Sequence, residues 1–66
     1  MNIKQIKKDV LDNKIEMFST MNFYRMVYLN YKNGSCIGKQ FENGADFVDF
    51  VKFLNENKVK FEPLQY

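Results

Sequence analysis

The side chains that could carry out catalysis in this chain are few. Cys36 is the single cysteine and there is no histidine, so the usual base that converts a catalytic thiol into a thiolate is missing. We therefore expect Cys36 to be a half-buried strand residue and not a nucleophile. A lone thiol without histidine also provides no zinc or iron–sulfur site. The sequence predicts no catalytic residue, no metal and no cofactor, and the protein is expected not to be an enzyme.

Three carboxylates, those of Asp46, Asp49 and Glu56, would share one side of a helix. Grouped carboxylates can bind Mg²⁺ or transfer protons. Acidic side chains near the start of a helix also stabilise it through the helix dipole, and we interpret these residues in that way. The Asn33-Gly34-Ser35 sequence matches a glycosylation site, but Asn-Gly is also what a tight turn needs, and a turn is the interpretation that we favour.

Lysines are concentrated near the N-terminus, at Lys4, Lys7, Lys8 and Lys14. The net charge of +2 arises from 10 basic and 8 acidic residues, which is too balanced to indicate nucleic-acid binding by itself. Exposed aromatic side chains on a sheet can stack on bases, and lysines can contact phosphates. A single-stranded nucleic-acid or RNA-binding domain is therefore the alternative hypothesis, with these four lysines as its contacts.

The size and composition place the chain in a narrow class. With 66 residues it is expected to form one small domain, 1–66, of marginal stability. A free thiol and the lack of an apolar leader favour a cytoplasmic protein, and no apolar run is long enough to span a membrane. Abundant lysine, asparagine and aromatic residues are the usage of an AT-rich genome, such as that of a low-GC bacterium or its phage.

The element order follows from periodicity and turn signals. Asn33-Gly34 between two apolar-rich runs is the strongest hairpin signal in the chain. Asn2 and Asn43 are suitable N-caps for two amphipathic helices, and Pro63 would end a short last strand. We predict an α+β two-layer sandwich with the order α-β-β-β-α-β. It has an antiparallel three-stranded meander, both helices on one face and a short C-terminal strand; the helices span 2–12 and 43–57 and the strands 14–20, 23–31, 36–42 and 58–62.

Counting outward from a two-residue Asn33-Gly34 loop pairs Tyr31 with Cys36, Leu29 with Gly38 and Arg25 with Glu42. A two-residue Met21-Asn22 connection would place Ile15 opposite Tyr28. The predicted core face then carries Ile15, Met17, Tyr24, Met26, Tyr28, Ile37 and Phe41. Two alternatives stay open: a shift of one residue would exchange the faces of the sheet, or residues 63–66 cover part of the predicted outer face.

The order α-β-β-β-α resembles that of the double-stranded-RNA-binding domain. That family has a lysine-rich start to its second helix, whereas residues 43–47 here read Asn-Gly-Ala-Asp-Phe. An acidic residue at this point would repel phosphate, so none of the family's contact residues is carried over.

The predicted outer face is too apolar for a surface that contacts only water. We predict a non-enzymatic protein-binding module, with a protein partner or a homodimer as the occupant of that face. Its size and composition suggest a small phage or mobile-element protein that inhibits or redirects a bacterial host enzyme or defence system. Aromatic residues and arginine are frequent interface anchors, and the predicted partner-binding residues are Phe18, Phe23, Arg25, Val27, Leu29 and Tyr31.

Overall fold

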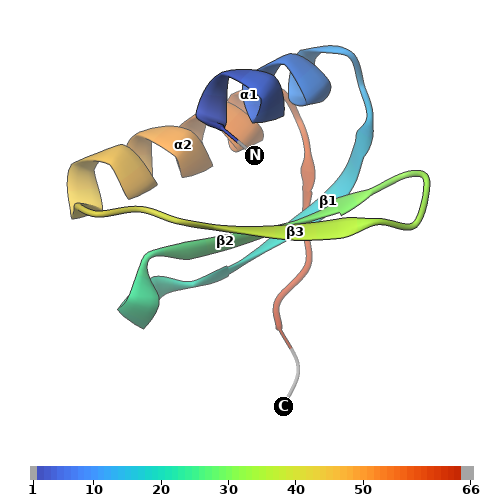
Figure 1. Ribbon diagram of the computed structural model, residues 1–66. Helices are drawn as coiled ribbons and strands as arrows, with labels where there is room; N and C mark the ends of the chain where they lie inside the picture. The colour runs from blue at the N-terminus through green and yellow to red at the C-terminus, as the bar shows by residue number, and fades with distance from the viewer. Residues whose placement is uncertain (1, 65–66) are drawn as a thin grey trace.

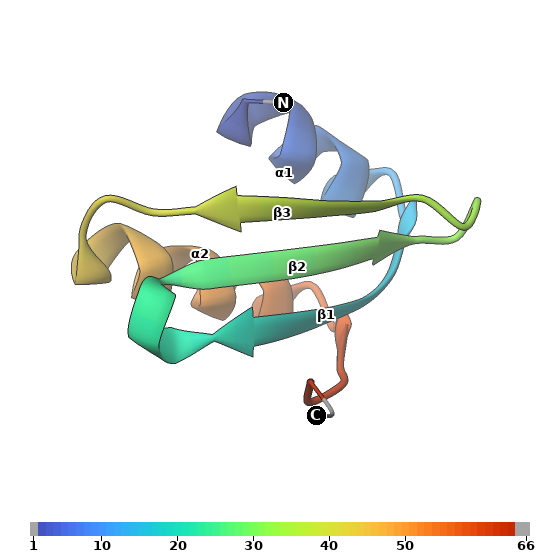
Figure 2. The same cartoon turned by 60° about the horizontal axis from the view of Figure 1, so that its bottom comes forward.

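A computed structural model describes residues 2–64 and confirms the α+β class. The elements, in chain order, are α1 (Ile3–Leu11), β1 (Ile15–Met21), the 3₁₀ turn η1 (Asn22–Tyr24), β2 (Met26–Tyr31), β3 (Cys36–Gln40), α2 (Gly44–Glu56) and β4 (Lys60–Phe61). The strands form one sheet in the order β3-β2-β1-β4. β1, β2 and β3 are antiparallel to one another, and β4 runs parallel to β1. Both helices cover the same face of the sheet (Figures 1 and 2).

The helices begin where the sequence predicts. The Oδ1 atom of Asn2 accepts a hydrogen bond from the Gln5 amide at 2.9 Å, and Asn43 Oδ1 accepts one from the Asp46 amide at 2.8 Å. These caps satisfy amides that have no partner within the helix. Each helix then turns its apolar stripe toward the sheet, and the buried stripe residues are Ile6, Val10, Phe47, Phe50 and Leu54.

The Asn33-Gly34 hairpin is confirmed, but its loop has three residues and not two. The Tyr31 amide donates to the Ser35 carbonyl at 2.8 Å, and the Gly34 amide donates to Tyr31 at 3.0 Å. Gly34 has φ +92°, the conformation that closes a three-residue loop with a bulge. The predicted register is therefore wrong by one residue: Leu29 lies opposite Ile37 and Asn30 lies opposite Cys36.

The connection between β1 and β2 also differs from the prediction. η1 and Arg25 replace the expected two-residue turn, and Arg25 takes a left-handed conformation with φ 53°. As a result Ser19, and not Ile15, pairs with Tyr28. The register also shifts between Ile15 and Met17. Because one extra residue in a strand reverses which face the following side chains occupy, Ile15 points to the helices while Met17 points away from them.

These shifts exchange the two faces of β2. Val27 and Leu29 are 0% exposed, Phe18 is 1% exposed and Tyr31 is buried as well. The assignment of these four residues to an accessible outer face is therefore wrong, because side chains alternate along a strand and one residue of slip inverts them. The predicted core residues Met17, Met26 and Tyr28 lie on the other face and are half-buried, and Tyr24 is 52% exposed. Ile15 and Phe41 do belong to the core, with Ile37 packed against it.

Neither helix within residues 2–64 has the length and apolar character that a membrane span requires.

Candidate interaction surface

Four of the six predicted partner-binding residues lie between the sheet and the helices. Phe18, Val27, Leu29 and Tyr31 form the centre of the core together with the helix stripes. A partner could reach them only if the helices separated from the sheet. Their side chains therefore stabilise the fold and do not form a surface.

Tyr31 has a polar partner inside this core. Its hydroxyl donates to Asp9 Oδ2 at 2.6 Å, and Gln5 Nε2 donates to Asp9 Oδ1 at 2.9 Å. These two hydrogen bonds hold the pKa of Asp9 below its usual value, and the bond from Tyr31 has the larger effect. Both lower the pKa because they favour the carboxylate. The pKa of Tyr31 is raised to about 12, chiefly by burial of its hydroxyl and secondly by the hydrogen bond to the Asp9 carboxylate. The pair joins α1 to β2 and satisfies a buried charge.

Phe23 and Arg25, the other two predicted residues, lie at one end of the sheet. Phe23 is 84% exposed, and its ring meets that of Tyr24 edge-on with centres 5.0 Å apart. Arg25 is half-buried, and its Nε donates to the Phe41 carbonyl at 3.0 Å while the Phe41 amide donates back to Arg25 at 2.9 Å. Arg25 thus fixes the end of β3, in place of the ion pair with Glu42 that the predicted register implied.

The face of the sheet turned away from the helices is here called the open face. Its side chains alternate with the core residues of β1, β2 and β3, and they are Met17, Ser19, Met21, Met26, Tyr28, Asn30, Cys36, Gly38 and Gln40. Three methionines and one tyrosine, at Met17, Met21, Met26 and Tyr28, are its large apolar side chains, and these types adapt well to a partner surface. The turn that carries Phe23 and Tyr24 projects from one end of the sheet on the same side (Figure 1).

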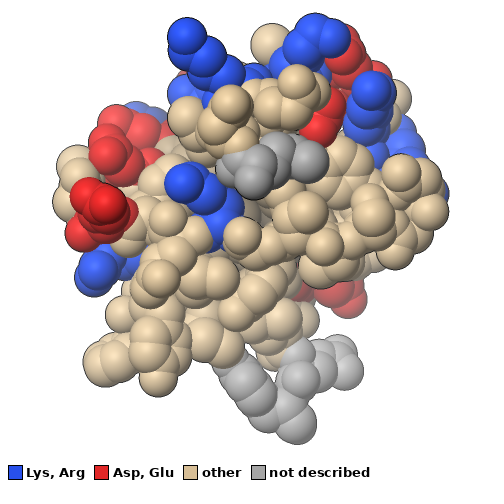
Figure 3. Space-filling view, in the orientation of Figure 1, with Lys and Arg blue, Asp and Glu red and all other residues tan. Residues whose placement is uncertain are grey.

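The open face has little charge of its own, and the basic residues lie elsewhere. Lys4, Lys7, Lys8 and Lys14 are all exposed; Lys8 pairs with Asp12 at 3.5 Å and Lys7 lies 5.3 Å from the centre of the Phe53 ring. Figure 3 shows most basic side chains over α1 and a group of acidic ones over the start of α2. The α1 lysines and the aromatic side chains of the open face are therefore on opposite layers.

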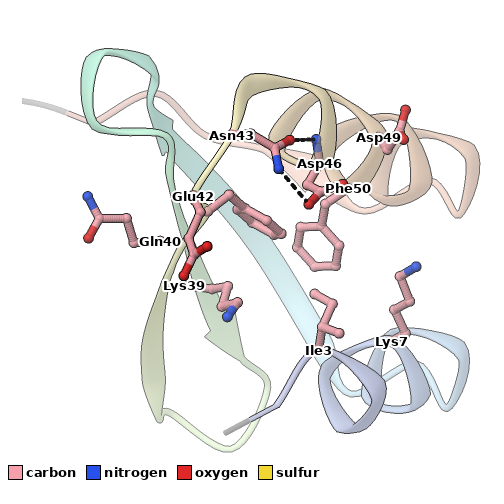
Figure 4. A pocket seen from close by; sticks show the side chains of 10 residues that line it. Ile3, Lys7, Lys39, Gln40, Glu42, Asn43, Asp46, Asp49 and Phe50 are labelled. Carbon is pink, nitrogen blue, oxygen red and sulfur yellow. Dashed lines mark hydrogen bonds between the residues drawn. The ribbon is translucent and has the colours of Figure 1, made fainter.

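A charged cleft of about 480 Å³ lies between α1, the end of β3 and the start of α2. Ile3 and Lys7 reach into it from α1, opposite the side chains of Glu42 and Asp46 (Figure 4). Its charges are of both signs, and Asn43 Nδ2 donates to Asp46 Oδ2 at 3.1 Å. Within the described residues no three histidine, cysteine or carboxylate side chains come together as metal ligands. The cleft therefore has no arrangement that indicates a particular ligand.

An apolar groove of about 460 Å³ runs between α2 and the β4 side of the sheet. Phe47, Val48 and Val51 form its α2 wall, and Phe61 closes it against Phe18, with ring centres 5.3 Å apart. Phe61 and Val48 are about half exposed. The groove is shallow, and Lys52 is the one charged residue on its walls.

Cys36 is exposed, so the prediction that it is half-buried is wrong. It lies at the start of β3 opposite Asn30, and not opposite the buried Tyr31 as the predicted register implied. The sequence analysis assigns Tyr24, the ring partner of Phe23, to the core, together with Met17 and Met26 of the open face. Val27 and Leu29 are purely aliphatic, whereas Met26 and Tyr28 carry polarisable or polar atoms. Both sides of β2 are nevertheless apolar, so this contrast alone does not assign the faces.

Neither a protein-family model nor a curated protein matches this sequence. Its function has to be inferred from the surfaces described above.

Proposed function

We propose that this protein is a non-enzymatic protein-binding module that holds its partner on the open face and on η1. The observation that carries the proposal is the exposed Phe23–Tyr24 pair, which lies beside a face that carries three methionines and Tyr28. A ring that is 84% exposed contributes nothing to burial in the core, and aromatic anchors of this kind dominate many interfaces. Exposed aromatic side chains beside half-buried methionines are also a frequent feature of interaction sites.

The partner that we propose is a bacterial host enzyme or a defence protein that the module inhibits or redirects. This part of the proposal is supported by the small size and the residue usage of the chain. We place the interaction in the cytoplasm, because an exposed thiol such as that of Cys36 stays reduced there.

Affinity capture from a bacterial lysate tests the proposal when matched variants are compared. The Phe23→Ser, Tyr24→Ser double variant removes both exposed rings and leaves the core intact. Leu11→Ser is the control, since Leu11 is 66% exposed on α1, on the other layer. We expect the wild type and the control to retain the same protein and the double variant to lose it.

The same capture distinguishes the nucleic-acid alternative. Binding through the α1 lysines would depend on phosphate contacts and would weaken steeply as salt increases. Contacts made by Phe23 and Tyr24 are apolar and should persist. Retention of nucleic acid that is released by salt would contradict the proposal. So would capture of the same protein by the wild type, the control and the double variant alike.

A further inference from the structure

β3 is an edge strand with hydrogen-bonding groups directed away from the sheet. It has β2 as a neighbour on one side and no strand among residues 2–64 on the other. The amide of Phe41 donates to Arg25 and the carbonyl of Ser35 accepts from Tyr31, so the odd-numbered residues face β2. Because these groups alternate along a strand, the amides and carbonyls of Cys36, Gly38 and Gln40 face outward.

The edge lacks the usual features that prevent another strand from adding to it. Cys36–Gln40 contains no proline, its pairing with β2 runs without a register shift, and all three outward-facing residues are exposed. Natural edges are protected by charges, proline or bulges. The one charged side chain, that of Lys39, lies on the helix side with its Nζ 5.7 Å from the centre of the Phe41 ring. Figure 3 shows a mostly uncharged surface around the edge.

We propose that a second copy of this chain pairs with β3 at this edge. The β3 strands of the two copies would run antiparallel, related by a two-fold axis that passes between their Gly38 residues. In this register Gly38 faces Gly38 of the other copy, and each Cys36 faces a Gln40. All outward-facing amides and carbonyls of the five residues then meet partners, which gives roughly six hydrogen bonds. An axis at residue 39 would instead set Lys39 against Lys39. With the axis at Gly38, Lys39 faces Ile37, and its charge points away from the axis toward Phe41.

Gly38 also shapes the open face for this pairing. A Cβ atom at Gly38 would lie 3.2 Å from Met26 Cε and 3.2 Å from Tyr28 Cε1, so both side chains already lean over the glycine toward the edge. Across a Gly38–Gly38 pair the two copies would bring two tyrosines and two methionines together. This apolar cluster adds burial to an edge that is short by itself, and the two open faces become one continuous surface.

The inference goes beyond the proposed function, because it concerns the strand edge and holds whether or not another protein binds. Light scattering of the purified protein under reducing conditions, over a range of concentrations, tests it. We expect the molar mass to rise with concentration from 7.9 kDa toward twice that value. Reducing conditions exclude a disulfide between exposed Cys36 side chains.

Two matched variants test the register. Cys36→Lys with Gln40→Lys sets like charges opposite each other at two pairs, and we expect the association constant to fall about tenfold or more. Cys36→Lys with Gln40→Glu sets opposite charges at the same two pairs and should restore association. Both variants change exposed side chains only, and circular dichroism confirms that each is folded.

A wild type that keeps a mass of 7.9 kDa at every concentration would overturn the inference. So would a double-lysine variant that associates as well as the lysine–glutamate variant. Neither result would affect the proposed function, which is tested with Phe23 and Tyr24 and not with the edge.

Discussion

Replacing Val27 by Thr and Leu29 by Lys together should unfold this protein. Both side chains are 0% exposed. Truncation of a buried leucine costs about 2–5 kcal/mol, and a lysine at that position also requires burial of an ammonium group. A hydroxyl at position 27 adds about 1–3 kcal/mol.

These costs approach or exceed the whole stability of such a domain. At about 0.05–0.15 kcal/mol per residue, 66 residues give a free energy of unfolding of roughly 3–10 kcal/mol. Far-UV circular dichroism and thermal denaturation measure the outcome, and we expect no cooperative transition in the double variant.

The matched control changes the neighbouring residues of the same strand. Met26→Thr with Tyr28→Lys places the same new side chains on the open face, where lysine can extend into water. We expect a loss of about 1–2 kcal/mol and a folded protein. A folded Val27/Leu29 variant together with an unfolded control would refute the assignment of the faces.

The other predictions concern the buried pair and the hairpin loop. Because the folded pKa of Asp9 is lowered, its contribution is present above the ordinary carboxyl pKa and should be lost as the pH falls through the folded value. Because the pKa of Tyr31 is raised from 10.0 to about 12, its contribution to the free energy of unfolding is complete below pH 10 and should be lost as the pH rises toward 12. Denaturation of Tyr31→Phe should lack this alkaline loss of stability. The same dependence of stability on alkaline pH in the wild type and in Tyr31→Phe would contradict this prediction. Gly34→Ala, at φ +92°, should destabilise by about 1 kcal/mol or more, whereas Gly44→Ala, with open space around it, should be near neutral in the same urea titration.

The sequence predicts the helices well because their signals are local. Asn2 and Asn43 identify the two caps, and the 3.6-residue period of the apolar residues identifies the buried stripes. The hairpin position is equally local. These features are sufficient for the α+β class, although η1 between β1 and β2 was not predicted.

The faces of the sheet could not be predicted, because they depend on loop lengths that the sequence does not fix. Asn-Gly suits a two-residue turn and also a three-residue loop in which only Gly34 takes a positive φ. β2 is apolar on both sides, so hydrophobicity does not choose between Val27 and Tyr28. The register shift near Ile15 has no signal in the alternation of β1.

The predicted partner-binding residues depend on the same loop lengths. Phe23 is exposed, as the sequence predicts, because a residue at the end of the sheet is less affected by a shift in strand register. Phe18, Val27, Leu29 and Tyr31 were placed on the wrong side. The Asp9–Tyr31 pair was missed, although Asp9 lies three residues after Ile6 on the buried side of α1.

The affinity of the captured partner for the matched variants is the most direct test of the central claim, that the open face and η1 bind a protein. In titration calorimetry, loss of two anchors worth about 2 kcal/mol or more should weaken binding by the Phe23→Ser, Tyr24→Ser variant at least about thirtyfold. Leu11→Ser should bind like the wild type. Equal affinities for the wild type and the double variant, or weakening by Leu11→Ser alone, would contradict the claim.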